Sequence, residues 1–186
     1  CTSESYRGLI RSSMPQFTDE QIIGEPVGRD TVNAVGLTAA VLAKKDKDAV
    51  FCVLTADHLI EPVEKFAELM HLGFQLVESD PNRLVTFSIK PTHAATGFGY
   101  VERGRVLPGT SDLAYKVERF VEKPDAVRAQ AYLESGVFGW NSGMFVWRAS
   151  TILDCLRRYK PESYEGLMRI QAAWGTADQK NVLEKV

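Results

Sequence analysis

The segment that most constrains the fold is residues 49–54 (AVFCVL), an unbroken apolar run rich in β-branched and aromatic side chains. Such a run favours a central strand that is buried on both faces of a sheet. In residues 62–78 the apolar positions then recur at helical spacing, and residues 83–90 (RLVTFSIK) alternate like a strand. Strand, helix and strand in this order predict a βαβ unit, and therefore a mostly parallel sheet with helices on both faces.

Helices and shorter strands are expected on both sides of this unit. The other predicted helices are residues 3–15, 32–45, 126–135, 150–159 and 161–173. The other predicted strands are residues 21–24, 97–104, 113–124 and 140–148, the last three bounded by Gly and Pro turns. Because these three are short and closely spaced, we expect the sheet to be extended there by antiparallel pairs, so that the sheet as a whole is mixed.

Composition narrows the choice of partners. The 186 residues include 22 Lys and Arg and 24 Asp and Glu, a net charge of −2, so bulk electrostatics favours neither nucleic acid nor an anionic membrane. No apolar run approaches the roughly 18 residues of a membrane helix, and no secretory signal is visible. Cys1, Cys52 and Cys155 form an odd number without CxxC spacing, which indicates a reducing compartment. We therefore expect a cytoplasmic protein that binds neither nucleic acid nor membrane.

Asp57 directly follows the predicted buried strand, in the segment TADH. Ligands of α/β sheets bind beyond the carboxyl ends of the strands, and Mg²⁺ commonly takes one or two carboxylates together with phosphate oxygens. Asp57 is therefore a candidate metal ligand, and a helix cap or turn residue is the alternative interpretation. The neighbouring His58 shares no metal-ligand spacing with His71 or His93, so we interpret it as structural or solvent-facing.

Polar residues also stand at the ends of two later strands. Glu122 and Lys123 in FVEKP close an apolar strand just before a proline, where they would point to opposite faces and reach two parts of one ligand. A solvated strand end is the alternative. Asn141 in WNSGMF lies beside an apolar run and must be exposed or hydrogen-bonded, and Gly143 would permit close approach of a ligand or another backbone.

Two glycine-containing loops complete the candidate sites. Glu25, Gly28 and Arg29 in EPVGRDT precede a predicted helix, where oriented backbone N–H groups favour an anion or a polar base. Gly97 and Gly99 in TGFGY form a lone GxG, which predicts a close-approach loop and not a dinucleotide site. No Ser–His–Asp or Cys–His arrangement can be assembled, so covalent catalysis is not indicated.

The segments EPVGRDT, LTADH, TGFGYVERG, FVEKPD and WNSGMFVW occur in an order and spacing that resemble those of the mannose-1-phosphate guanylyltransferases, in the sugar-phosphate nucleotidyltransferase family. The resemblance spans nearly the whole chain. It implies a Rossmann-like nucleotidyltransferase domain, with a mixed, mostly parallel central sheet flanked by helices. On this reading residues 1–186 form part of a catalytic domain.

The resemblance also implies an activity, the Mg²⁺-dependent transfer of GMP from GTP to α-D-mannose 1-phosphate by direct attack on the α-phosphorus. GDP-mannose and pyrophosphate are the products. Asp57 would hold Mg²⁺ and Lys123 the mannose phosphate, and these two are the residues expected to be catalytic. Glu122, Asn141 and the backbone at Gly99 would hold the mannose hydroxyls.

On the nucleotide side, the resemblance implies contacts from two segments. They are Glu25, Gly28 and Arg29, and then Thr55, Ala56 and Asp57. A carboxylate such as Glu25 can accept both hydrogens of the guanine N1–H and amino group. Homodimers are common in the resembled family.

The chain departs from the family pattern at several points. It contains neither the glycine-rich G-G-x-G-[ST]-R-L-x-P loop that wraps the triphosphate nor the second metal-binding aspartate. Asp30 and Asn33 replace residues of the usual GRNTAPA loop, and Thr55 stands where proline is commoner. We therefore expect catalysis only from a longer form of the protein. The alternatives are a non-catalytic sugar-nucleotide-binding or regulatory homologue and a transferase for another hexose 1-phosphate.

Overall fold

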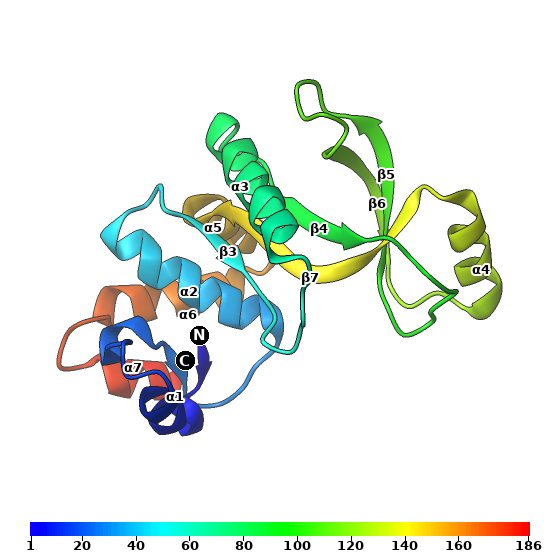
Figure 1. Ribbon diagram of the computed structural model, residues 1–186. Helices are drawn as coiled ribbons and strands as arrows, with labels where there is room; N and C mark the ends of the chain where they lie inside the picture. Colours follow the sequence, from blue (N-terminus) through cyan, green and yellow to red (C-terminus); the bar gives the residue numbers. More distant parts are fainter. The chain divides into compact units, whose positions relative to one another are not determined.

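The computed structural model describes all 186 residues, and the chain divides into two compact units whose elements are labelled in Figure 1. Unit 1 is Cys1–Phe51 together with Arg148–Val186, and unit 2 is Cys52–Trp147. The boundary passes through strand β3 (Val50–Val53) and the last residue of β7 (Phe138–Arg148). Each unit has its own packing and is described separately.

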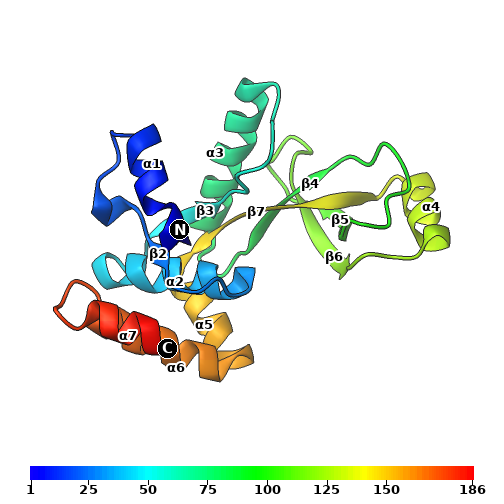
Figure 2. The same ribbon diagram turned by 90° about the horizontal axis from the view of Figure 1, so that it is seen from below.

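Unit 1 is a helical layer built around α2 (Thr31–Lys45). This helix packs against α5 (Ala149–Tyr159) and α6 (Pro161–Ala173), and α7 (Gln179–Lys185) packs on α6 (Figure 2). Asp30 caps α2 by accepting the backbone N–H of Asn33 at 3.1 Å. The apolar residues buried in this layer are Val35, Leu37, Val41, Ile152, Leu153, Leu156, Leu167 and Ile170.

The rest of unit 1 consists of short elements. Strand β1 (Thr2–Ser3) pairs in parallel with β2 (Gly24–Glu25). Between them lie α1 (Arg7–Ser13) and the 3₁₀ turns Glu4–Tyr6 and Asp19–Gln21. This pairing sets the start of the loop that carries the EPVGRDT segment, because β2 ends at Glu25.

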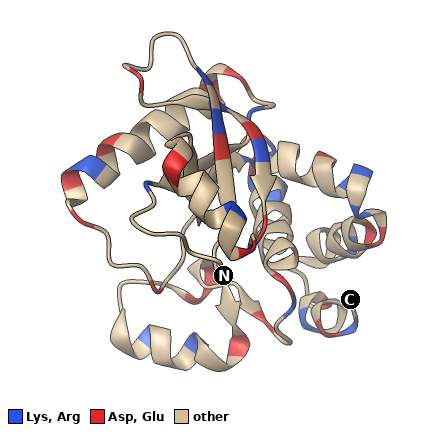
Figure 3. Ribbon diagram, turned by 90° about the vertical axis from the view of Figure 1, so that its right-hand side faces the viewer, with Lys and Arg blue, Asp and Glu red and all other residues tan.

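Unit 2 contains most of a five-stranded sheet. Its order is β3, β7, β5 (Tyr100–Val106) and β6 (Tyr115–Val121), and β4 (Val85–Ile89) also pairs with β7. Helix α3 (Val63–Ser79) packs near β4 and helix α4 (Ala126–Ser135) precedes β7. A small core of Tyr100, Ala129, Tyr132 and Phe138 closes the end of the sheet at α4. Basic and acidic residues both occur along β5 and β6, and Figure 3 shows both signs distributed over the molecule.

The α/β class and all the predicted helices are confirmed, and α4 and α6 have the predicted bounds. Two features of the predicted sheet need correction. In the five-stranded sheet the β4–β7, β5–β6 and β5–β7 pairs are antiparallel, and the parallel β1–β2 pair forms a separate two-stranded sheet. The predicted antiparallel extension is therefore confirmed, but the predominance of parallel pairing is not seen in these pairs. The short connection between the successive strands β5 and β6 favours antiparallel pairing.

Strand β3 is the second correction. Its four residues are half-buried, whereas the apolar run predicted burial on both faces. The reason is its position at the end of the strand order, with β7 as its only strand neighbour within these 186 residues. The short strand predicted at residues 21–24 lies at Gly24–Glu25 instead.

Candidate functional site

The start of β5, the end of β6 and the first part of β7 meet at one place in unit 2 and bring Gly99, Glu122 and Asn141 together. Tyr100 pairs with Val121 on one side and with Trp140 on the other. Gly99, Glu122 and Asn141 are the sequence neighbours of these three residues and therefore also lie close to one another. The backbone N–H of Asn141 donates to the carbonyl of Gly99 at 2.8 Å. A Cβ atom added to Gly99 would lie 2.9 Å from Glu122 Oε2 and 3.6 Å from Asn141 Cβ.

This close approach explains the glycine at position 99, because any side chain there would displace the Glu122 carboxylate. The three residues whose contact with a sugar was expected from the sequence thus surround a single small region. A carboxylate, a carboxamide and a backbone segment without a side chain offer both acceptors and donors to a polar ligand.

Lys123 differs from its expected geometry. Its φ is +38°, which ends the regular strand at Val121 and turns the side chain toward its neighbour. Lys123 Nζ lies 3.6 Å from Glu122 Oε1, and the two side chains are 65% and 73% exposed. The prediction that the two charges point to opposite faces is therefore wrong. An exposed pair of this kind contributes little stability, so both groups remain free to contact a ligand.

The TADH segment lies beside the Asn141 region. A Cβ atom on Gly143, whose φ is +72°, would lie 3.3 Å from Thr55 Cγ2. Thr55 Oγ1 is buried without a hydrogen-bond partner, although buried hydroxyls are normally paired. This orphaned hydroxyl lies two residues after the end of β3.

Asp57 follows two residues later, and its side chain is 87% exposed. Its one ion-pair contact is with His58 Nε2 at 4.0 Å, and Ala56 beside it is exposed. No group of three or more His, Cys, Asp and Glu side chains could hold a metal ion. A single free carboxylate nevertheless suits Mg²⁺, which keeps several waters and takes phosphate oxygens from a substrate.

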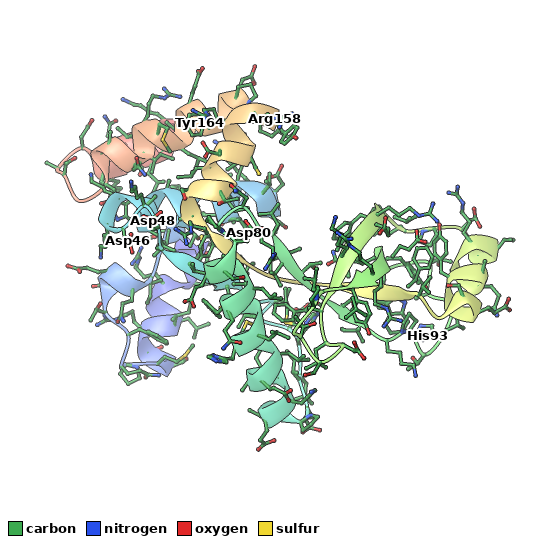
Figure 4. All side chains as sticks on the ribbon, turned by 90° about the horizontal axis from the view of Figure 1, so that it is seen from above. Asp46, Asp48, Asp80, His93, Arg158 and Tyr164 are labelled. Carbon is green, nitrogen blue, oxygen red and sulfur yellow. The ribbon has the colours of Figure 1, made fainter.

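Aromatic residues border the same region. The ring of Trp140 is met edge-on by His93 at 4.9 Å and by Phe98 at 5.1 Å between ring centroids. His93, labelled in Figure 4, lies in the segment before β5. The sequence predicts no role for His93, which lacks metal-ligand spacing, or for Phe98. No local pattern points to either residue.

The remaining predicted residues lie in unit 1. Glu25 is half-buried, Arg29 and Gly28 are exposed, and a cavity of about 310 Å³ is bordered by Glu25, Arg29, Asn33, Glu162, Ser163 and Arg169, among others. Burial raises the pKa of the Glu25 carboxyl, and the positive N-terminus and Arg29 oppose this shift. The partly desolvated carboxylate of Glu25 thus borders an open cavity.

No helix is both long and apolar enough to cross a membrane. This agrees with the absence of an apolar run of that length in the sequence.

Comparison with known proteins gives a consistent picture. The sequence pattern of the nucleotidyl transferase family matches residues 3–180. The chain is 40% identical over 178 residues to a mannose-1-phosphate guanylyltransferase of Klebsiella pneumoniae and 39% identical over 178 residues to one of Escherichia coli. These matches cover 95% of this chain but 37% of each relative, so the chain spans little more than a third of their length.

A solved structure supports the same likeness. A crystal structure described as mannose-1-phosphate geranyltransferase, from Thermus thermophilus, superimposes with a TM-score of 0.82 at 27% identity. The superposition covers 99% of this chain and 51% of the other.

Proposed function

The chain belongs to the nucleotidyl transferase family, and from that premise we propose that the protein containing it forms GDP-mannose and pyrophosphate from GTP and α-D-mannose 1-phosphate. The observation that carries this proposal is the convergence of Gly99, Glu122 and Asn141 from three adjacent strands, in a chain about 40% identical to guanylyltransferases acting on mannose 1-phosphate. The proposal concerns the whole protein, since the chain spans only part of such enzymes.

Sugar recognition falls to unit 2. The Glu122 carboxylate accepts hydrogen bonds from sugar hydroxyls, the Asn141 side chain contacts a neighbouring hydroxyl, and the bare backbone at Gly99 lets the sugar ring come close. Lys123 places its ammonium group on the sugar phosphate. The short distance between Lys123 Nζ and Glu122 Oε1 supports this, because one phosphorylated sugar would then meet both side chains.

Asp57 is the proposed ligand of a divalent cation, and we propose Mg²⁺. When bound, Mg²⁺ would neutralise charge on the phosphate oxygens. The exposure of Asp57, at the carboxyl end of β3, supports this role, because its carboxylate is free to take a hydrated ion together with substrate oxygens. The buried Thr55 hydroxyl and Ala56 border the nucleotide in this proposal.

Glu25, Gly28 and Arg29 are proposed to contact the guanine nucleotide. Glu25 would accept from the guanine N1–H and amino group, and the raised pKa of its carboxyl is compatible with a partly desolvated base site. A Cβ atom built on Gly28 would meet nothing within 4 Å, so the space around this backbone is open to the nucleotide.

The reaction needs no nucleophile from the protein in this proposal. A phosphate oxygen of mannose 1-phosphate attacks the α-phosphorus of GTP, the new P–O bond forms, and the bond to the leaving pyrophosphate breaks. The residues of this chain contribute by holding the two substrates in line and by placing positive charge near the phosphates. A cytoplasmic location and a homodimer remain predictions.

The test is pyrophosphate release by the full-length protein with GTP, Mg²⁺ and mannose 1-phosphate. We expect turnover, its loss in Asp57→Ala, and a raised KM for mannose 1-phosphate in Lys123→Ala. Lys116→Ala is the matched control, because Lys116 is an exposed lysine near the start of β6, at the opposite end of the strand from Glu122 and Lys123. Binding of GDP-mannose without any turnover would overturn the proposal and favour a regulatory homologue. Preference for glucose 1-phosphate would overturn the choice of sugar.

A further inference from the structure

The carboxamide of Asn141 is held in one of its two possible orientations. The backbone N–H of Gly143, which can only donate, points at Asn141 Oδ1 at 3.3 Å. Because a donor must face an acceptor, the oxygen of the amide is turned toward this backbone and its NH₂ group is turned away. No hydrogen bond to a protein acceptor involves Asn141 Nδ2, so the two hydrogens of this group are available to a ligand.

A second group reinforces this orientation from a different strand. Thr86 lies on β4, pairs with Phe145 of β7, and places its hydroxyl 3.3 Å from Asn141 Oδ1 and 3.4 Å from the carbonyl of Met144. The hydroxyl has one hydrogen, which these two acceptors share, and because the hydroxyl is half-buried this interaction is partly shielded from water. Without it, Asn141 Oδ1 would keep a single long hydrogen bond, and the amide would rotate more freely.

We propose that Thr86 is a positioning residue for sugar recognition, which holds Asn141 so that its NH₂ group donates to a sugar oxygen beside Glu122. This inference rests on the proposed function. It assigns opposite polarity to the two neighbouring side chains, because Glu122 accepts from one hydroxyl and Asn141 donates to another oxygen. Two neighbouring sugar hydroxyls can fill both roles, since each hydroxyl can donate and accept.

The experiment compares Thr86→Val, which is nearly isosteric but lacks the hydroxyl, with Thr86→Ser, which keeps it. In the full-length protein Thr86→Val should raise KM for mannose 1-phosphate about five- to tenfold, the usual effect of one lost hydrogen bond. KM for GTP and kcat should stay unchanged, and Thr86→Ser should restore the wild-type KM. Thr38→Val is the matched control, because Thr38 Oγ1 donates to the carbonyl of Ala34 within α2 of unit 1.

A double-mutant cycle tests whether Thr86 acts through Asn141. In an Asn141→Ala background Thr86→Val should add no further increase in KM. An equal increase in both backgrounds would overturn the inference, as would a wild-type KM in Thr86→Val. Asn141→Asp gives a second route that does not depend on Thr86, since aspartate keeps the acceptor for Gly143 N–H but cannot donate; it should weaken sugar binding at least as much as Thr86→Val.

These outcomes are separate from those of the proposed function. If the wild-type protein released no pyrophosphate, the proposed function would fail, and the same variants would be compared by calorimetric binding of mannose 1-phosphate. Weaker binding in Thr86→Val but not in Thr86→Ser would still support the inference. Equal binding by wild-type, Thr86→Val and Asn141→Asp proteins would overturn it.

Discussion

Replacement of Gly99 by alanine gives the sharpest test of how the strand ends form a site. The added Cβ would lie 2.9 Å from Glu122 Oε2, whereas non-bonded heavy atoms pack best at about 3.5–4.0 Å. The Glu122 carboxylate would therefore have to move by roughly 0.6 Å or more. Because this side chain is 73% exposed, the movement costs the folded state little.

The cost should appear in binding instead. A displaced carboxylate loses its hydrogen bond to a sugar hydroxyl, and hydrogen bonds to charged groups contribute about 1.5–3 kcal/mol. Gly99→Ala should accordingly raise KM for mannose 1-phosphate roughly 10- to 150-fold, with little change in the denaturation midpoint. The assay is pyrophosphate release by the full-length protein at varied mannose 1-phosphate and saturating GTP.

Gly97→Ala provides the matched control two residues away. A Cβ atom on Gly97 meets nothing within 4 Å, so this variant should bind the sugar phosphate like the wild type. Equal KM values for Gly97→Ala and Gly99→Ala would refute the reasoning, because they would show that the contact between positions 99 and 122 has no part in sugar binding.

Three further predictions concern stability. Gly36→Ala should lower the free energy of unfolding by about 1–3 kcal/mol in denaturant melts, because the added Cβ would lie 2.6 Å from Cδ1 of the buried Leu167. Gly8→Ala is the control on an open helix face, and it should be neutral or stabilising by up to about 1 kcal/mol. Burial raises the pKa of the Glu25 carboxyl above its ordinary value of 4.5. The protonated Glu25 carboxyl therefore adds to the free energy of unfolding below pH 4.5, and this contribution is lost as the pH rises through the raised pKa. Glu25→Gln should therefore flatten this part of the stability profile, measured by melts from about pH 4 to 8. Asp125→Ala should cost about 1 kcal/mol, because the Asp125 carboxylate caps α4 by accepting the backbone N–H of Arg128. Asp178→Ala should change little, since the Asp178 carboxylate accepts no backbone N–H of α7, and equal losses would contradict the capping argument.

Much of the fold could be predicted because local patterns determine helices. The proline at position 161 and the capping aspartate at 125 mark the starts of α6 and α4, and apolar periodicity sets their length. The site could be predicted in part for a similar reason. Glu122 follows the end of β6 and Asn141 lies in the first part of β7, both in segments that the sequence predicts as strands, and strand pairing then brings them together.

The rest depends on contacts between distant segments. Nothing near Thr86 distinguishes it from any other threonine on a strand, since its contact with Asn141 arises from the pairing of β4 with β7. Likewise, strand alternation predicted opposite directions for Glu122 and Lys123, but a positive φ at Lys123 cancels that alternation. The half-burial of β3 follows from its place in the strand order, which local sequence does not determine.

Strand β6 has β5 on one side and no strand on its other side within these residues, so part of its backbone is open to hydrogen bonding. An open edge is a hazard, because a strand from another molecule can add to it and start aggregation. Lys116, Glu118 and Arg119 interrupt the exposed Val117 and Phe120 along this edge. An incoming strand would have to desolvate these charges, and the composition of β6 thereby protects the hairpin that carries Glu122 from aggregation.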